Sequence, residues 1–264
     1  MPVVRLIIEY DGTAYHGWQR QSAAATIQGT VESMIHRISG ERPSLVGSGR
    51  TDAGVHALAQ TAHFKTESSL TPDAWCRALN ALLPADIKVI AVDFVPASFH
   101  ARFSAVRKRY RYRILNRPVP SPLERMTSWH VPSRLNLSAM RRAAAALIGT
   151  HDFRAFEASD PSHRAARDTH CRLTLCAIHR QGDLVVIEIE SDRFLKYMVR
   201  NVVGTLVEIG LARRPAGELG TILASSDRRR AGVTAPAHGL TLIAVRYRKV
   251  APPVRRRSGP PRRD

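Results

Sequence analysis

A glycine-rich loop holds the residues of this chain that are most suggestive of chemistry. Residues 47–54 read GSGRTDAG, so Arg50 and Asp52 stand two positions apart among small residues. In an extended segment, side chains at i and i+2 project from the same face. A guanidinium beside a carboxylate favours the charged form and lowers the pKa of the acid. The spacing therefore predicts an ionised Asp52, which suits a nucleophile or an electrostatic stabiliser better than a general acid.

A plain structural role fits the same loop, because aspartate is common in turns and at helix caps. The loop matches none of the usual phosphate-binding or nucleophile motifs. A dinucleotide-binding loop needs glycine where Asp52 stands, and a Walker loop needs Lys-Ser/Thr where Val55 and His56 stand. Ser48 lacks the glycine two positions earlier that a serine nucleophile elbow requires. Local spacing alone leaves both a turn and a nucleophile open for Asp52.

The charge of the chain points to a polyanionic partner. Its 264 residues carry 40 Lys and Arg against 22 Asp and Glu, a formal net charge of +18 at pH 7. This excess favours nucleic acid, although a basic surface coat without a partner would have the same composition. The three cysteines match neither a disulfide framework nor a zinc spacing, and no long apolar run predicts a membrane span. We expect a cytoplasmic protein with no metal, no small-molecule cofactor and no membrane contact.

The order of the predicted elements favours an α+β fold with mostly antiparallel sheets. Sequence periodicity predicts strands within 3–12, between the glycine loop and Phe64, and within 87–95, 107–115, 171–179, 183–191 and 239–249. It also predicts helices from Thr26, from Thr71, over 138–148 and over about 193–210, and a further short helix before the last strand. Three prolines between 118 and 122 predict a division into an N-terminal half, 1–116, and a C-terminal half, 117–250. The Pro/Arg-rich tail, 251–264, has almost nothing to bury and is expected to be disordered.

Five segments, in this order, resemble the tRNA pseudouridine synthase A family. They read YDGTAYHGWQRQ (10–21), GRTDAGVHALAQ (49–60), FHARFSAVRKRYRYRI (99–114), FLKYMVRNVVGTL (194–206) and GLTLIAV (239–245). The resemblance implies two similar α/β halves whose antiparallel sheets join around a central catalytic cleft. It also implies isomerisation of uridine to pseudouridine at tRNA positions 38, 39 and 40, in the anticodon stem and loop. The family resemblance further implies a homodimer that shares each tRNA.

The resemblance assigns roles to four residues. The family's catalytic aspartate falls on Asp52 and the arginine of the same motif on Arg50. The active-site tyrosine falls on Tyr110, and the arginine that pairs with the aspartate falls on Arg200. In these roles Arg200 would keep the carboxylate ionised. Tyr110 would stack on a flipped-out base and help remove the proton from C5.

Further RNA contacts are predicted from charge and position. Arg109 and Arg111 alternate with the tyrosines of the strand 107–115 and could meet phosphates, and Gln19 and Arg20 could touch RNA. The glycines around Asp52 would leave room for the backbone of a flipped nucleotide. Simpler alternatives are a core tyrosine, a solvated helix face for Arg200, and a basic RNA-binding protein without catalysis. Such a binder needs cations and aromatic residues but no buried carboxylate.

Overall fold

The computed structural model of this protein describes residues 1–158 and 168–248. The predicted basic tail, 251–264, lies outside the described residues. Ten strands form one sheet that runs through both predicted halves of the chain. Its strands are β1 (Val3–Tyr10), β2 (Val46–Gly47), β3 (His56–Lys65), β4 (Ile87–Val95), β5 (Ala105–Leu115), β6 (Trp129–His130), β7 (Gly149–Asp152), β8 (His170–Gln181), β9 (Leu184–Ser191) and β10 (Leu240–Tyr247).

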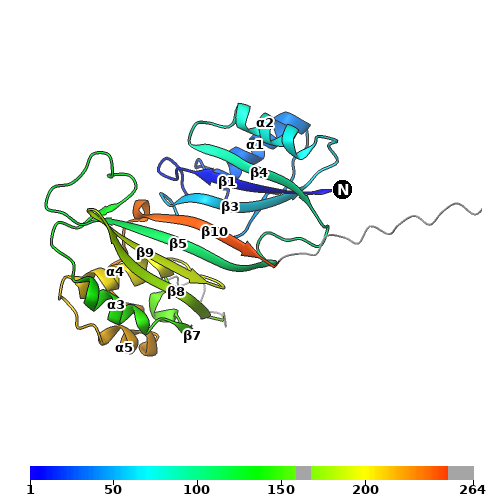
Figure 1. Ribbon diagram of the computed structural model, residues 1–264. Coiled ribbons are helices and arrows are strands. Elements are labelled where there is room, and N and C mark those ends of the chain that lie inside the picture. The colour runs from blue at the N-terminus through cyan, green and yellow to red at the C-terminus, as the bar shows by residue number, and fades with distance from the viewer. Residues whose placement is uncertain (159–167, 249–264) are drawn as a thin grey trace, which may run out of the picture.

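The sheet is mostly antiparallel, in the order β4-β1-β3-β10-β5-β9-β8-β7, with β2 beside β3 and β6 beside β5. The last strand of the chain, β10, lies in its middle, parallel to β3 and antiparallel to β5 (Figure 1). The C-terminal strand therefore joins the sheet of the first half to the sheet of the second. This architecture confirms the predicted α+β class with a mostly antiparallel sheet.

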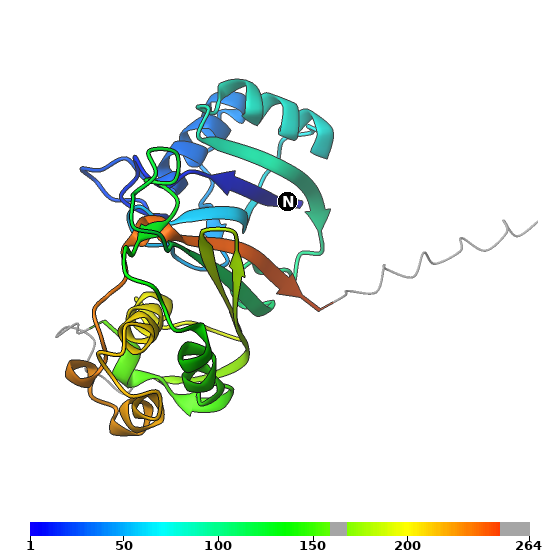
Figure 2. The same cartoon turned by 60° about the vertical axis from the view of Figure 1, so that its left-hand side comes forward.

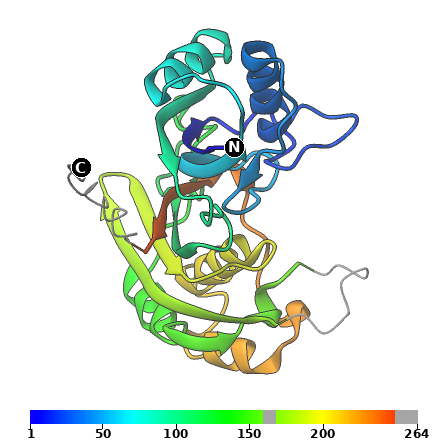
Figure 3. The same cartoon turned by 90° about the vertical axis from the view of Figure 1, so that its right-hand side faces the viewer.

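Helices cover the sheet in two groups, one at each end (Figures 1 and 3). The helices are α1 (Ile27–Ser39), α2 (Pro72–Leu82), α3 (Leu137–Ala145), α4 (Met198–Gly210) and α5 (Glu218–Ser225), with short 3₁₀ turns at Arg154–Phe156, Arg228–Arg230 and Ala237–Gly239. Within residues 1–158 and 168–248, no helix has the length and apolarity needed to cross a membrane.

Local sequence signals account for the starts of the first two helices. The hydroxyl of Thr26 caps α1 by accepting from the Gly29 N–H. The hydroxyl of Thr71 caps α2, which has proline at its first position, as the sequence predicts. The predicted long helix begins later than expected, at Met198 instead of about 193, because Tyr197 has a left-handed backbone conformation with φ of +62°. A residue with positive φ cannot continue a right-handed helix.

Alternation along the paired strands separates two faces of the sheet. Leu6 and Ile8 of β1 are fully buried on the face that α1 and α2 cover, and Tyr112 of β5 is buried on the corresponding face near α4. Side chains one position away, such as Arg5 and Arg109, emerge on the opposite face, which carries no helix (Figure 2). We call these the helix face and the open face.

Candidate active site

Asp52 stands in a tight turn between β2 and β3. The Val55 N–H donates to the Asp52 carbonyl at 3.1 Å, and Gly54 has a left-handed φ of +76° within this turn. The preceding residue is also held, because the Thr51 carbonyl accepts from the Trp18 N–H at 3.0 Å. The backbone is thus fixed on both sides of Asp52, which gives its carboxylate a defined direction.

Arg200 reaches Asp52 from the second half of the chain, 148 positions away. It lies in the first turn of α4, and its Nη1 is 3.4 Å from Oδ2 of Asp52. Its Nε donates to the Ala235 carbonyl at 2.8 Å, and its Cζ lies 4.7 Å from the centre of the Tyr197 ring. Tyr197 itself is in the left-handed conformation, which is costly for a residue other than glycine. The guanidinium is therefore oriented by three groups, and the pair implied by the resemblance forms.

The pKa of Asp52 differs from the sequence prediction. Burial of the carboxyl raises this pKa above its usual value, and the charges of Arg200 and Lys196 offset only part of the rise. The prediction of a lowered pKa was wrong, because it neglected desolvation and took Arg50 as the neighbouring cation. Only 27% of the Asp52 side chain is exposed, so the cost of removing its charge from water outweighs one ion pair.

Tyr110 lies beside this pair on the helix face of β5. It is 8% exposed, and its ring packs edge-on against Phe194 with 5.0 Å between ring centres. Burial is the main reason that the pKa of its phenol is raised, and the charge of Asp52 adds to the effect. Among the described residues no protein group hydrogen-bonds to this hydroxyl. Tyr110 is thus a neutral donor next to a buried carboxylate.

The chain is similar to known proteins over most of its length. Residues 6–104 and 143–248 match the family model described as tRNA pseudouridine synthase. The chain is 49% identical over 247 residues to tRNA pseudouridine synthase A of Syntrophotalea carbinolica, which covers 94% of this chain and 97% of that protein. The identity is 47% over 244 residues with the enzyme of the same name from Thermoanaerobacter sp. (strain X514), covering 92% and 99%. It is 46% over 260 residues with the one from Myxococcus xanthus, covering 98% and 97%.

This chain belongs to the tRNA pseudouridine synthase family. The family model covers Asp52 and Arg200, whereas β5 with Tyr110 lies between its two matched segments. The protein is therefore an isomerase with the pseudouridine synthase fold, as the sequence motifs predict.

Three predicted RNA contacts of this pseudouridine synthase gather near one another beside the loop of Asp52. Arg50 is exposed, and its Nε donates to the Gln19 side-chain carbonyl at 3.1 Å instead of pairing with Asp52. The Gln19 amide in turn donates to Gln28 at 2.7 Å. Arg20 pairs with Glu32 at 3.2 Å and remains 69% exposed. The structure places Gln19, Arg20 and Arg50 together, with both arginines accessible to a large ligand.

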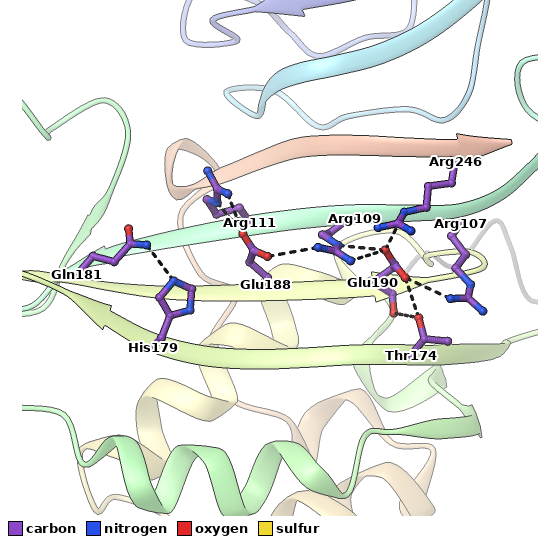
Figure 4. Close-up of polar contacts among 9 residues, drawn as sticks. All are labelled: Arg107, Arg109, Arg111, Thr174, His179, Gln181, Glu188, Glu190 and Arg246. Carbon is purple, nitrogen blue, oxygen red and sulfur yellow. Dashed lines mark hydrogen bonds and ion pairs between the residues drawn. The ribbon is translucent and has the colours of Figure 1, made fainter.

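The other two predicted RNA contacts lie elsewhere. Arg109 and Arg111 project from the open face of β5, away from Asp52, and meet carboxylates of β9 (Figure 4). Arg109 is 2.9 Å from Glu190, and Arg111 is 2.8 Å from Glu188. Carboxylates of the neighbouring strand β9 thus pair with both arginines. The structure does not bring them to the site that holds Asp52, Tyr110 and Arg200.

The glycines of the loop serve the packing of the protein more than the sequence suggested. A Cβ at Gly47 would lie 2.6 Å from the Trp18 ring, so this glycine allows the indole to pack beneath the loop. Gly54 supplies the positive φ of the turn. Only at Gly49 is the nearest atom the end of a flexible side chain, the Nζ of Lys108, 3.0 Å from an added Cβ. An added Cβ at Gly54 would meet only the Cβ of Ala237, at 3.4 Å, so of these three glycines Gly47 is the one whose surroundings are filled by a rigid ring.

Sequence reasoning missed two residues that support the site. Nδ1 of His56 accepts from the Gly12 N–H at 3.1 Å, and Nε2 lies 2.9 Å from the Met126 carbonyl and 3.0 Å from that of His238. His56 therefore joins three loops around the middle of the sheet. Lys196 was also missed, and its charge acts on Asp52. His56 lies in the segment GRTDAGVHALAQ, which carries part of the family resemblance, so its position was visible in the sequence. Its hydrogen-bond partners were not, because they lie 44 to 182 positions away. Within the described ranges, no cluster of three or more His, Cys, Asp or Glu side chains could hold a metal.

Proposed function

We propose that this enzyme isomerises uridine to pseudouridine in tRNA, at positions 38, 39 and 40 of the anticodon stem and loop, with Asp52 as the nucleophile. The observation that carries the proposal is the Asp52–Arg200 pair, a largely buried carboxylate held by a cation from the other half of the chain. A protein that only binds RNA has no use for such a carboxylate, since it repels phosphate. The motif resemblance supports the tRNA positions.

The reaction exchanges one bond to the ribose for another. The N1–C1′ glycosidic bond breaks, the uracil turns, a C5–C1′ bond forms, and the proton of C5 is lost while N1 gains one. Asp52 either attacks C1′ directly or assists formation of a glycal intermediate, and both routes require the ionised carboxylate. Arg200 favours that form against the effect of burial. Exchanging the N1–C1′ bond for a C5–C1′ bond neither oxidises nor reduces the nucleoside, so protein side chains alone can catalyse it.

Tyr110 is proposed to contact the base of the target uridine. Its raised pKa keeps the phenol neutral at physiological pH, so it acts as a hydrogen-bond donor and a packing surface, not as a phenolate base. A uridine inside a stem or a stacked loop cannot reach a carboxylate in this position. We therefore expect the target nucleotide to be flipped out of its stack, with Arg50, Arg20 and Gln19 beside the RNA.

The decisive experiment is tritium release from tRNA that carries 5-³H-uridine. We expect Asp52→Asn to bind tRNA with nearly unchanged affinity and to release tritium at least about 1,000-fold more slowly, because a neutral amide cannot act as the nucleophile. Equal release by the wild type and the variant would exclude the nucleophile role.

The matched control is Asp93→Asn. Asp93 also pairs with an arginine, Arg5, at 2.7 Å, but it lies on the open face at the edge of the sheet. We expect this variant to release tritium at the wild-type rate. Transcripts lacking uridine at one of the three positions would identify which sites are used. The homodimer stays a prediction from the resemblance, and the cytoplasmic location stays a prediction from the composition of the sequence.

A further inference from the structure

A lysine in the same site has no role in the chemistry described above. Lys108 lies on the helix face of β5, two positions before Tyr110, and pairs in register with Ser191 of β9. Its Nζ lies against Gly49, since a Cβ built there would be 3.0 Å from that nitrogen. Lys108 therefore touches the loop that carries Asp52, three residues before the carboxylate.

The ammonium group of Lys108 is largely buried, yet among the described residues it has neither a hydrogen bond nor an ion pair. Burial, followed by repulsion from Arg102 and Arg193, lowers the pKa of Lys108 to about 8. A buried cation without a partner costs free energy unless a ligand supplies the missing charge. The chain has only five lysines, and this one stands among arginines that are paired on the other face.

The two neighbouring arginines are accessible. Arg102 is exposed and lies over the Phe103 ring, 5.7 Å from its centre. Arg193 pairs with Asp168 at 3.0 Å, and 37% of its side chain is exposed. Three cations thus act on one another near Gly49, and one carboxylate, that of Asp168, pairs with Arg193. Such an arrangement attracts an anion with several oxygens.

We propose that Lys108, together with Arg102 and Arg193, binds a phosphodiester group of the RNA strand next to the uridine held at Asp52. Gly49 has no side chain, so an RNA backbone can approach the ammonium closely at that point. A phosphate there fixes the register of the strand relative to Asp52, as phosphate contacts do in nucleic-acid complexes. This assignment rests on the proposed function, because it requires tRNA to enter at Asp52.

The first test is the salt dependence of tRNA binding. Each neutralised phosphate contributes close to one unit, about 0.7–0.9, to the slope of log Kd against log salt. We expect Lys108→Met to reduce the slope by about one unit and to weaken binding about tenfold at low salt. Lys108→Arg, which keeps the charge, should retain the slope. The turnover rate at saturating tRNA should change less than Kd, since the contact positions the strand.

The control is Lys65→Met, which removes the same charge from an exposed position on the open face of β3. Equal slopes for the Lys108→Met and Lys65→Met variants overturn the proposal. Failure of the proposed function has a different signature, because tritium release would then survive Asp52→Asn whatever the salt slopes show.

A second test uses the unmodified protein and does not depend on folding of a variant. At pH 8 about half of an amine with a pKa of about 8 is neutral and reactive, whereas an ordinary lysine is almost fully protonated. We expect brief acetylation at pH 8, followed by mass spectrometry, to modify Lys108 in preference to Lys65. Saturating tRNA should protect Lys108 and leave Lys65 unchanged. Absence of protection contradicts the proposal, whether Lys108 reacts in both states or in neither.

Discussion

Both faces of β5 carry basic side chains, but the two faces differ in whether these side chains meet carboxylates. On the open face its four arginines, at positions 107, 109, 111 and 113, all meet carboxylates, with distances of 2.8 to 3.4 Å to Glu188, Glu190 or Glu124. On the helix face Lys108 has no acidic partner within the described residues, and Tyr110 lies beside Asp52. Charge that looks available for RNA in the sequence is thus largely paired with carboxylates on the open face, whereas on the helix face it is largely buried.

The difference follows from what lies across the strand. Glu188 and Glu190 alternate along β9 in register with Arg111 and Arg109, so ladder pairing brings opposite charges together. Burial opposes ionisation of Glu190, but hydrogen bonds from Arg109 and Thr174 outweigh it, and the pKa of Glu190 is lowered. In Asp52 the balance is reversed, because burial outweighs the nearby positive charges and the pKa of the carboxyl is raised. The open face pairs its charges, whereas the helix face holds a largely buried carboxylate at Asp52 and, near Gly49, an ammonium without an acidic partner among the described residues.

Among substitutions on the two faces, the greatest loss of turnover is expected on the helix face. Arg200→Gln removes the cation that opposes desolvation of Asp52, so the pKa of the carboxyl rises further. Because the proposed reaction needs the ionised form, the acidic limb of the turnover profile should move to higher pH. Turnover at neutral pH should fall about 100-fold or more.

Tritium release measured from pH 5 to pH 8 tests this prediction. Arg213→Gln, at an exposed position just after α4, is the matched control and should keep the wild-type profile. An unshifted acidic limb for Arg200→Gln would show that the pair does not control ionisation of Asp52.

An intermediate effect is expected on the open face, and on stability instead of turnover. The Glu190 side chain is 5% exposed and lies within 3.4 Å of Arg107, Arg109 and Arg246. Glu190→Gln leaves these arginines without their shared carboxylate and should lower the free energy of unfolding by about 2–3 kcal/mol at pH 7. The folded-state pKa of Glu190 lies below its usual value, so its contribution is present above the unfolded pKa and is lost as pH falls.

The difference in urea unfolding between the wild type and Glu190→Gln should therefore stay nearly constant from pH 7 to about pH 5 and shrink below about pH 4.5. Glu9→Gln, at an exposed position on β1, is the control and should cost little at either pH. A difference that stays constant with pH would show that lost packing, not charge, accounts for the effect.

The smallest effect is expected for Arg111→Gln. This side chain is 39% exposed, and its pair with Glu188 is open to solvent, so the change should cost less than about 1 kcal/mol. The salt slope of tRNA binding should stay at the wild-type value, in contrast to Lys108→Met. A slope reduced by about one unit would restore the predicted RNA contact of Arg111.

Local signals in the sequence predicted most elements of the fold. Caps at Thr26 and Thr71, and the alternation of residues 107–115, each depend on neighbours a few positions away. The predicted start of α4 was too early, because no residue type within 193–197 indicates the positive φ of Tyr197. The sequence also did not predict that residues 233–235 pack directly on α4, where the Val233 carbonyl leaves no space for a Cβ at Gly204.

The family and the fold class follow from the sequence, because they depend on residue types in a recognisable order, and the same motifs predict Asp52, Tyr110 and Arg200 as the site. Which charges are available depends on the tertiary structure. Arg50 donates to Gln19, Arg109 pairs with Glu190, and Lys108 lies against Gly49 in the loop of Asp52. Desolvation and charge pairing depend on what lies across a strand or beneath a loop, and residues far apart in the chain meet there. The sequence shows each charge, and the fold determines what it faces.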